Sequence, residues 1–419
     1  MINNSQNRIK NDYVLGVTFA IAYFFIAREL NECSLFRVLF GSADLGYKMS
    51  GWASFSVWIF FAIWAVFYKK FKLKWKELVP VFVIVFYFGC VAFSTGMNDL
   101  GYHKLFTIVL NTMSVLFLII MACDQPSNAR LFIASISWLY LFFTMLNALS
   151  ILFGDLWESL GIWGSQCFIG NFDTSGFAIE MGMFYALLDE HLNKTKYSKA
   201  KFWVFIAVFY FDVLTVLHVS GTTVIAAGLI AIFLVFKFVR RIAERTNLMV
   251  FFGISLVFFA SLMWFAEPIM NSVPVSFLLK NVFHKSLTLT GRLDMWPWML
   301  AEYIYLKPVF GYGIGENSIL YGNGRLNSRG EPIFYYHTHN QILQTWYDGG
   351  LVTLAVIIVL FIVMAIILKK CKDRKLAGVV SWMLFVFLIV HNSNIINPYN
   401  WTCTFEIMVL ASSLIYAKE

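Results

Sequence analysis

The chain has 419 residues, of which 59% are hydrophobic and only 13% are charged. Soluble globular domains carry about 25% charged residues, so the composition excludes that class and is typical of a polytopic membrane protein. The net charge of +8 does not indicate nucleic-acid binding, because basic residues also orient membrane proteins. The six cysteines form no CxxC pair, so neither a zinc site nor a thiol-redox motif is indicated.

Apolar segments recur along the whole chain, each close to the roughly 20 residues that a helix needs to cross a bilayer. Helices are expected because hydrocarbon leaves the polar groups of any other backbone unsatisfied. The segments are 13–30, 51–68, 79–95, 104–122, 130–153, 172–190, 202–219, 222–239, 249–266, 343–368, 376–396 and 400–417. The sequence therefore predicts an all-α integral membrane protein with about 12 transmembrane helices. The first apolar run is followed by no small-residue cleavage site, so no cleavable signal peptide is expected.

The distribution of Lys and Arg predicts the orientation. If the N-terminus lies in the cytoplasm and the spans alternate, 22 of the 32 basic residues fall on the cytoplasmic side, as the positive-inside rule requires. Both termini are then cytoplasmic, and a long loop between spans 9 and 10 faces the opposite side. We therefore predict spans 1–9 in residues 1–266, an outer loop with short helices in 267–342, and spans 10–12 in 343–419. A loop of this length is typical of functional segments.

Three stretches of the outer loop carry local structural signals. The stretch 291–300 is typical of the start of an amphipathic helix. The run 307–315 is rich in glycine and predicts a tight turn rather than a nucleotide site, because it follows no βαβ unit. The stretch 321–330 is expected to form a flexible basic tip. No GxxxxGK[ST] motif is present, so an ATP-driven motor is not indicated.

The run His337-Thr338-His339-Asn340 closes the outer loop directly before span 10. A histidine changes charge near neutral pH without special help, and a neutral imidazole can accept a proton from a sugar hydroxyl. His339 is therefore a candidate general base. His337 has three open interpretations: it orients His339, it contacts substrate, or it is incidental.

Arg292 has two competing interpretations. Beside Trp296 and Trp298 on an outer loop, its side chain could reach toward lipid phosphates in the way that long cationic side chains do at interfaces. Alternatively, its planar guanidinium could bind a phosphate or pyrophosphate group through two parallel hydrogen bonds. Gly291 would then allow the ligand to approach closely.

Polar residues also mark the outer starts of spans 6 and 8, in 170–176 and 219–223. Asp, Ser and Thr are favoured helix N-caps, and a helix N-terminus can also attract an anionic group. The capping interpretation is preferred, although the two are compatible.

Together, these features resemble the superfamily of bacterial O-antigen ligases and Wzy-type polysaccharide polymerases, over roughly residues 165–365. The residues that carry the resemblance are Gly170-Asn171-Phe172, Ser220, Gly291-Arg292 with Trp296, Pro308 with Gly311-Tyr312-Gly313-Ile314-Gly315, and His339-Asn340 with Gly350. The nine residues between Asn340 and Gly350 make the last of these the most specific.

The resemblance implies a membrane glycosyltransferase of the GT-C type that acts at the periplasmic face of the bacterial inner membrane. Its substrates would be glycans on undecaprenyl pyrophosphate, and neither metal nor other cofactor is expected, since the lipid pyrophosphate is the leaving group. The family's catalytic histidine corresponds to His339 and its loop arginine to Arg292. Further substrate contacts are expected from His337, Asn340, Arg325, Arg329, Trp296 and Tyr312. A chain-length co-polymerase is left open as a partner, and no nucleic acid is expected.

One departure from the family pattern bears on the activity. The ligases usually carry Ser-Arg where this chain has Ser220-Gly221, so a second phosphate-binding arginine is missing, which favours a polymerase over a ligase that transfers glycan to lipid A-core. Arg325, Arg329 or Lys285 could replace it. A flippase or other transporter of lipid-linked glycans is the alternative from another class. Transporters carry polar residues in mid-span and often internal repeats, whereas here the polar residues gather at one membrane face.

Overall fold

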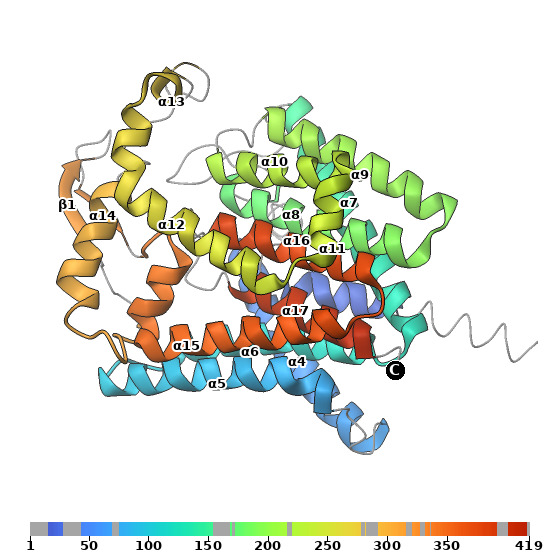
Figure 1. Ribbon diagram of the computed structural model, residues 1–419. Helices are drawn as coiled ribbons and strands as arrows, with labels where there is room; N and C mark the ends of the chain where they lie inside the picture. The colour runs from blue at the N-terminus through green and yellow to red at the C-terminus, as the bar shows by residue number, and fades with distance from the viewer. Residues whose placement is uncertain are drawn as a thin grey trace, which may run out of the picture.

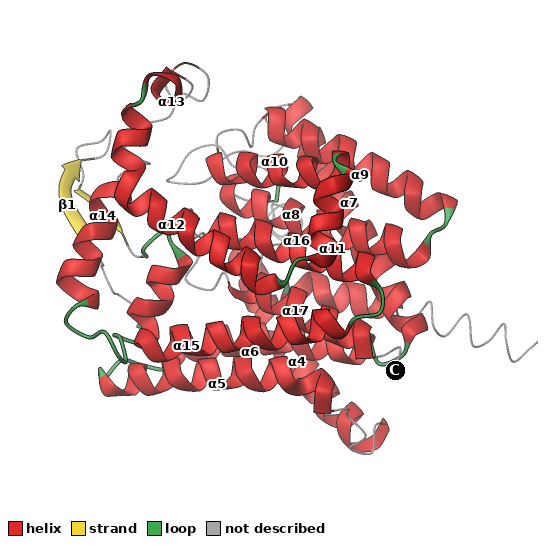
Figure 2. Ribbon diagram, viewed as in Figure 1, coloured by secondary structure: helices red, strands yellow, loops and turns green. Residues whose placement is uncertain are grey.

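The protein is a bundle of long apolar helices (Figures 1 and 2). The computed structural model describes residues 16–27, 43–68, 75–153, 168–169, 172–215, 220–277, 281, 292–315, 321–326, 332–335, 337–391 and 401–416. After a first helix, Gly16–Ile26, the elements are α4 (Ala43–Ile63), η1 (Trp64–Tyr68), α5 (Trp75–Met97), α6 (His103–Ala122), α7 (Pro126–Phe153), α8 (Phe172–Asn193), α9 (Lys196–Thr215), α10 (Gly221–Val235), α11 (Lys237–Arg245), α12 (Leu248–Asn271), α13 (Val273–Phe277), α14 (Arg292–Met299), η4 (Leu300–Ile304), β1 (Tyr321–Leu326), β2 (Pro332–Tyr335), α15 (Gln341–Lys370), α16 (Arg374–His391) and α17 (Trp401–Tyr416).

Each of the twelve predicted segments overlaps one of these helices. Within the described ranges, seven helices are long and apolar enough to cross a membrane, or eight if the bent pair α10 and α11 counts as one span. The prediction of a helical, membrane-embedded protein is therefore confirmed. The full count of twelve crossings, the GT-C topology and the three-part division of the chain stay predictions.

Predicted span 8, residues 222–239, is two helices rather than one. The chain bends by 97° between α10 and α11, because Phe236 adopts an extended backbone conformation. The sequence beyond the bend explains why the span stops there. α11 carries Lys237 and three arginines and buries only Val239 and Ala243, and it packs on α16. A helix with that many cations cannot continue into hydrocarbon without a large cost.

The prediction of a flexible tip at 321–330 is wrong for residues 321–326, which form a strand. β1 pairs with β2 in an antiparallel hairpin, with Tyr321 opposite Tyr335 and Gly322 opposite Phe334. Figure 2 shows β1 as a yellow arrow beside the red helices. Glycine and asparagine are depleted in strands, so the composition of β1 did not indicate a strand. Pairing with β2 stabilises it.

A small hydrophobic cluster, which we call the outer core, lies apart from the main core of the bundle. It forms where α12, α14, η4 and the beginning of α15 meet, at the end of the molecule that also carries the hairpin (Figure 1). Its buried members are Phe259, Met295, Trp296, Met299, Ile304, Leu343 and Tyr347. The outer core is important because it attaches the short helix of the outer loop to the first residues of α15.

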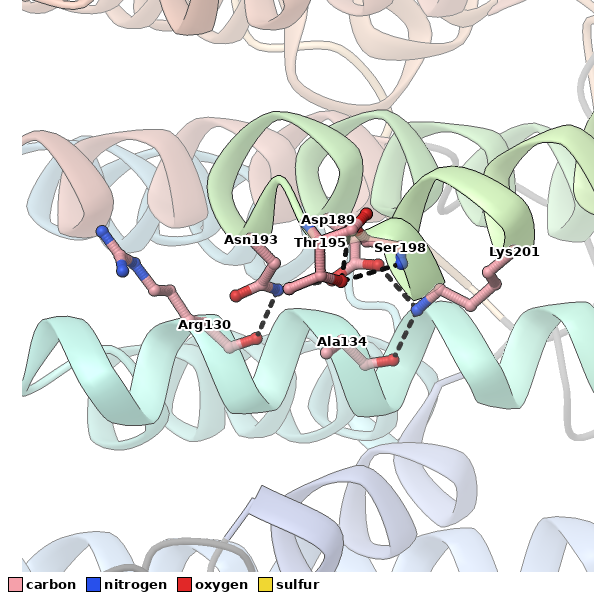
Figure 3. A network of polar contacts seen from close by, with 7 residues as sticks. All are labelled: Arg130, Ala134, Asp189, Asn193, Thr195, Ser198 and Lys201. Atoms are coloured by element: carbon pink, nitrogen blue, oxygen red, sulfur yellow. Dashed lines mark hydrogen bonds and ion pairs between the residues drawn. The ribbon is translucent and has the colours of Figure 1, made fainter.

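Near the C-terminal end of α8, a buried ion pair joins α7, α8 and α9 (Figure 3). Lys201 of α9 lies 2.7 Å from Asp189 of α8, and both side chains are only 2% exposed. The same ammonium group donates to the carbonyl of Ala134 in α7 at 3.1 Å. Thr195 and Ser198 bond each other's backbone N–H groups at the start of α9, which fixes the turn between α8 and α9.

Replacing Lys201 with methionine should therefore lower the free energy of unfolding by about 3 kcal/mol, because a buried carboxylate loses its cation. The double variant D189N/K201M should recover most of this loss, since it removes both charges. Thermal unfolding of the purified protein in detergent measures the effect. A K201M variant as stable as the parent would show that the pair contributes nothing.

Candidate functional site

Asn340 marks the start of α15. It is the N-cap residue of that helix, and its side-chain oxygen accepts a hydrogen bond from the backbone N–H of Leu343 at 2.9 Å. Its side chain is fully buried, and Asn is among the best N-cap residues. The His-Thr-His-Asn run thus reaches the helix through a fixed cap.

Thr338, between the two histidines, is held by all of its polar groups. Its N–H donates to the side-chain oxygen of Gln344 at 3.0 Å, and its carbonyl accepts from Trp296 Nε1 at 2.8 Å. Its hydroxyl donates to the carbonyl of Asn340 at 2.6 Å. The backbone between the histidines is therefore fixed from α14 on one side and from α15 on the other.

The two histidines lie side by side and are both partly exposed. The centroids of the His337 and His339 rings are 4.2 Å apart. His339 has a φ of +52°, in the left-handed region that few residues other than Gly, Asn, Asp and His adopt. Such backbone strain concentrates at functional sites. The geometry presents two neighbouring imidazoles at the edge of the outer core.

Trp296 connects this histidine loop to the predicted anion-binding residue. The indole is 1% exposed, packs edge-to-face on Phe259 with centroids 5.8 Å apart, and donates to Thr338. Arg292 begins α14 and is partly buried. It precedes Trp296 by four residues, so the two side chains lie on the same face of α14, one turn apart. Arg292 thus lies one helical turn from the residue that bonds the histidine loop.

α15 is broken at Gly350, the glycine of the resemblance. Its φ of 70° and ψ of −167° are not helical and fall in a region that is accessible essentially to glycine alone. A Cβ at this position would overlap the carbonyl of Val309. The part of α15 before the break, residues 341–349, turns sharply away from the long part that follows (Figure 1).

The glycine-rich turn of the outer loop fills this break. Two loop N–H groups donate to carbonyls before the break, and two loop carbonyls accept from N–H groups after it. The bonds are Tyr312 N to Tyr347 O (2.7 Å), Gly313 N to Asp348 O (2.8 Å), Leu351 N to Pro308 O (2.8 Å) and Val352 N to Val309 O (3.3 Å). A separate segment of the chain therefore satisfies the backbone groups that the break leaves open.

The predicted tight turn is confirmed, and the structure explains its glycines. Gly311 and Gly313 have positive φ values, and a Cβ on either would overlap a neighbouring backbone. The turn is also attached to α5, where the hydroxyl of Thr95 accepts from the N–H of Ile314 at 3.1 Å. Asn98, directly after α5, donates to the carbonyl of Gly311 at 3.2 Å. α5, the turn and α15 thus form one unit.

Tyr312 lies in this turn, with its ring stacked on that of Tyr347 at a centroid distance of 4.9 Å. Its hydroxyl donates to the carbonyl of Tyr303 at 3.2 Å. Burial and the neighbouring Tyr303 raise the pKa of Tyr312 above its ordinary value, so it remains a neutral phenol at physiological pH. Lys307 lies over the same ring, 4.8 Å from its centroid.

Several predicted residues cannot be placed in the site. The backbone of Arg325 belongs to β1, but its side chain, Arg329, Lys285 and Gly170-Asn171 lie outside the described residues. Ser220 is the N-cap residue of α10, but its side chain makes no capping hydrogen bond. Its hydroxyl instead lies 2.9 Å from that of Thr222. The predicted N-cap position is therefore confirmed for Ser220, while its hydroxyl bonds neighbouring hydroxyl groups.

The structure adds two residues that the sequence did not single out, Gln344 and Asp348. The amide of Gln344 also donates to the carboxylate of Asp348 at 2.8 Å. The sequence did carry a signal for this pair, since polar residues four apart lie on one face of a helix and an acidic residue at the start of an apolar span is rare.

Asn340 and Trp296 were predicted as substrate contacts. In the structure, the side chain of Asn340 bonds the N–H of Leu343 and that of Trp296 bonds the carbonyl of Thr338.

No metal centre emerges from the described residues, in which no three His, Cys, Asp or Glu side chains form a group that could hold an ion. The described part of the site presents two imidazoles, a guanidinium and neighbouring hydroxyl and indole groups.

One family of known proteins is similar to part of this chain. The family model described as O-Antigen ligase matches residues 204–358, a range that contains Arg292, the glycine-rich turn, both histidines and Gly350. No curated protein and no solved structure matches the chain. The predicted resemblance is thus confirmed over the region that forms the site. Residues 204–358 are therefore similar to the family of O-antigen ligases.

Proposed function

We propose that this protein polymerises oligosaccharide repeat units carried on undecaprenyl pyrophosphate, at the periplasmic face of the bacterial inner membrane. The observation that carries the proposal is the histidine pair held on a fixed backbone at the start of α15, with Arg292 on the adjoining α14. This arrangement combines a candidate base with a candidate anion clamp, and it lies within the region that matches the family.

In the proposed reaction, His339 removes the proton from a hydroxyl of the non-reducing sugar of one substrate. The oxygen attacks the anomeric carbon of the second substrate, a new glycosidic bond forms, and the bond to the pyrophosphate breaks. Undecaprenyl pyrophosphate leaves with the bonding electrons. Attack from the face opposite the leaving group inverts the configuration of the anomeric carbon.

Arg292 is proposed to hold the pyrophosphate of the donor. A guanidinium offers a planar pair of donors that fits phosphate oxygens, and its charge persists at every physiological pH. Donors aimed at a leaving group that gains charge lower the barrier most when they are fixed in advance. The attachment of α14 through Trp296 to the histidine loop supplies that rigidity.

The second candidate is a ligase with the same chemistry that transfers the glycan to lipid A-core. The description of the matching family as O-Antigen ligase favours it. Gly221 favours the polymerase, since the ligases of this superfamily usually carry arginine there.

Purified protein in proteoliposomes with a lipid-linked repeat unit separates the two. Chain growth in the absence of another acceptor supports the polymerase. Transfer only after lipid A-core is added supports the ligase. Release of no undecaprenyl pyrophosphate under either condition would reject both enzymatic proposals and leave the transporter alternative.

Replacing Arg292 with lysine is expected to reduce the rate of chain growth about tenfold, because lysine keeps the charge but cannot offer two parallel hydrogen bonds. The measurement is the initial rate with saturating acceptor and varied donor. R241K on the exposed face of α11 is the matched control. Full activity of R292K would favour the interpretation that this arginine only reaches toward lipid phosphates.

A further inference from the structure

A chain of hydrogen bonds connects the histidine loop to an acidic residue deeper in α15. The N–H of Thr338 donates to Gln344 Oε1 at 3.0 Å, and Gln344 Nε2 donates to Asp348 Oδ1 at 2.8 Å. Thr338 is covalently bonded to both His337 and His339. A change at Asp348 therefore reaches the two imidazoles through a single side chain.

Asp348 occupies a buried position, with a 2% exposed side chain. Its carbonyl accepts from Gly313, so its backbone takes part in the loop that fills the helix break. Lys104 of α6 and Tyr87 of α5 lie close enough to interact with it electrostatically. α17 contributes Trp401, which bonds Thr345 at 2.7 Å and carries no charge.

The groups at the two ends of this series of hydrogen bonds decide which atoms of Gln344 donate and which accept. The backbone N–H of Thr338 can only donate, so Gln344 must present its oxygen to it. The amide nitrogen of Gln344 then faces Asp348 and needs an acceptor, which a carboxylate supplies with two oxygens.

We propose that Asp348 is a positioning residue for the histidine pair, which it places through Gln344 and the backbone of Thr338. The proposal rests on the proposed function only in that His339 is the base whose position matters. Asp348 touches no substrate. Its contribution is to fix the Gln344 amide, and thereby the peptide that presents both imidazoles.

Two variants test the series of hydrogen bonds from Thr338 to Asp348 directly. In Gln344→Glu, two carboxylates face each other and the donor between them is lost. The kcat for chain growth is expected to fall about 50-fold at the alkaline end of a pH profile, where both carboxyl groups are ionised, with little change in KM for the lipid-linked donor. As the pH falls, one proton shared between the two carboxylates replaces the missing N–H, so the variant should recover activity relative to wild type.

The second variant, Gln344→Glu/Asp348→Asn, reverses the two groups. The introduced asparagine amide can then donate to the introduced carboxylate, and that carboxylate can still accept from the N–H of Thr338. Activity should return to within about fivefold of wild type, and the ratio to wild type should no longer depend on pH. Asp348→Leu, which removes the acceptor altogether, should lose activity without any rescue at low pH.

Spectra of ¹⁵N-labelled histidine in the detergent-purified protein give a readout that does not need turnover. The imidazole signals that disappear in His339→Asn identify the reporter. They should shift in Gln344→Glu at the alkaline end of the pH profile and return in the double variant. Unchanged signals, or a double variant no more active than Gln344→Glu alone, would overturn the proposal. If wild type forms no polymer, the function is rejected while the spectra still decide the role of Asp348.

Discussion

Replacing His339 with alanine is expected to reduce the rate of chain growth at least about 100-fold, because general-base catalysis contributes roughly 10²–10⁴ to such rates. The loss should appear in kcat, since the imidazole acts on the proton that moves in the transition state. The measurement is polymer length and initial rate in proteoliposomes, with protein amount verified by immunoblot. In cells that make a long surface glycan, the same variant should leave only short chains.

Two further variants separate chemistry from folding. Asparagine tolerates the left-handed backbone of His339, whose φ is +52°, but its amide accepts no proton at neutral pH. His339→Asn should therefore be as stable as wild type and as inactive as the alanine variant. His103→Ala, at the exposed start of α6, should keep full activity. An active His339→Asn enzyme would rule out the general-base role.

Replacing Gly350 with alanine should cost about 4 kcal/mol of unfolding free energy and abolish activity. The backbone region of Gly350 costs a residue with a Cβ about 1–3 kcal/mol. The overlap of that Cβ with the carbonyl of Val309 adds a similar amount, as overpacking of a filled space does. The glycine-rich turn would be displaced from α15, and with it the groups that complete the helix. Thermal unfolding and the rate of chain growth both report the change.

Gly89→Ala is the matched control for this variant. Gly89 lies in the interior of α5, and a Cβ there would meet nothing within 4 Å. Alanine is about 1 kcal/mol better than glycine in a helix interior, so the control should be as stable as wild type or slightly more stable. If Gly350→Ala unfolded at the same temperature as Gly89→Ala, the break in α15 would not depend on glycine.

The sequence predicted the features that depend on local composition. Long apolar runs predicted the helices, and the run at 307–315 predicted a tight turn at Gly311 and Gly313. The apolar segment 343–368 predicted the long part of α15. These signals could be read because hydrophobic length and glycine content belong to neighbouring residues.

The features that were missed depend on contacts between distant segments. The insertion of the turn into the break at Gly350 requires α5, the outer loop and α15 together, and no periodicity encodes it. The hairpin was missed because a strand rich in glycine depends on its partner. The link from Thr338 through Gln344 to Asp348 was missed because it becomes visible only when the loop folds back onto its own helix.

The break in α15 also sets the depth of the site. The uninterrupted part of the helix, from Leu351 to Leu368, rises about 27 Å, close to the roughly 30 Å thickness of a hydrocarbon core. The sharply turned part before it, residues 341–349, then lies across the helix end at the level of the headgroups. In the proposed reaction, the anomeric carbon that is attacked is bonded directly to the pyrophosphate of a carrier lipid, which sits at that same level. A base at this height would be placed to deprotonate the attacking hydroxyl beside that carbon.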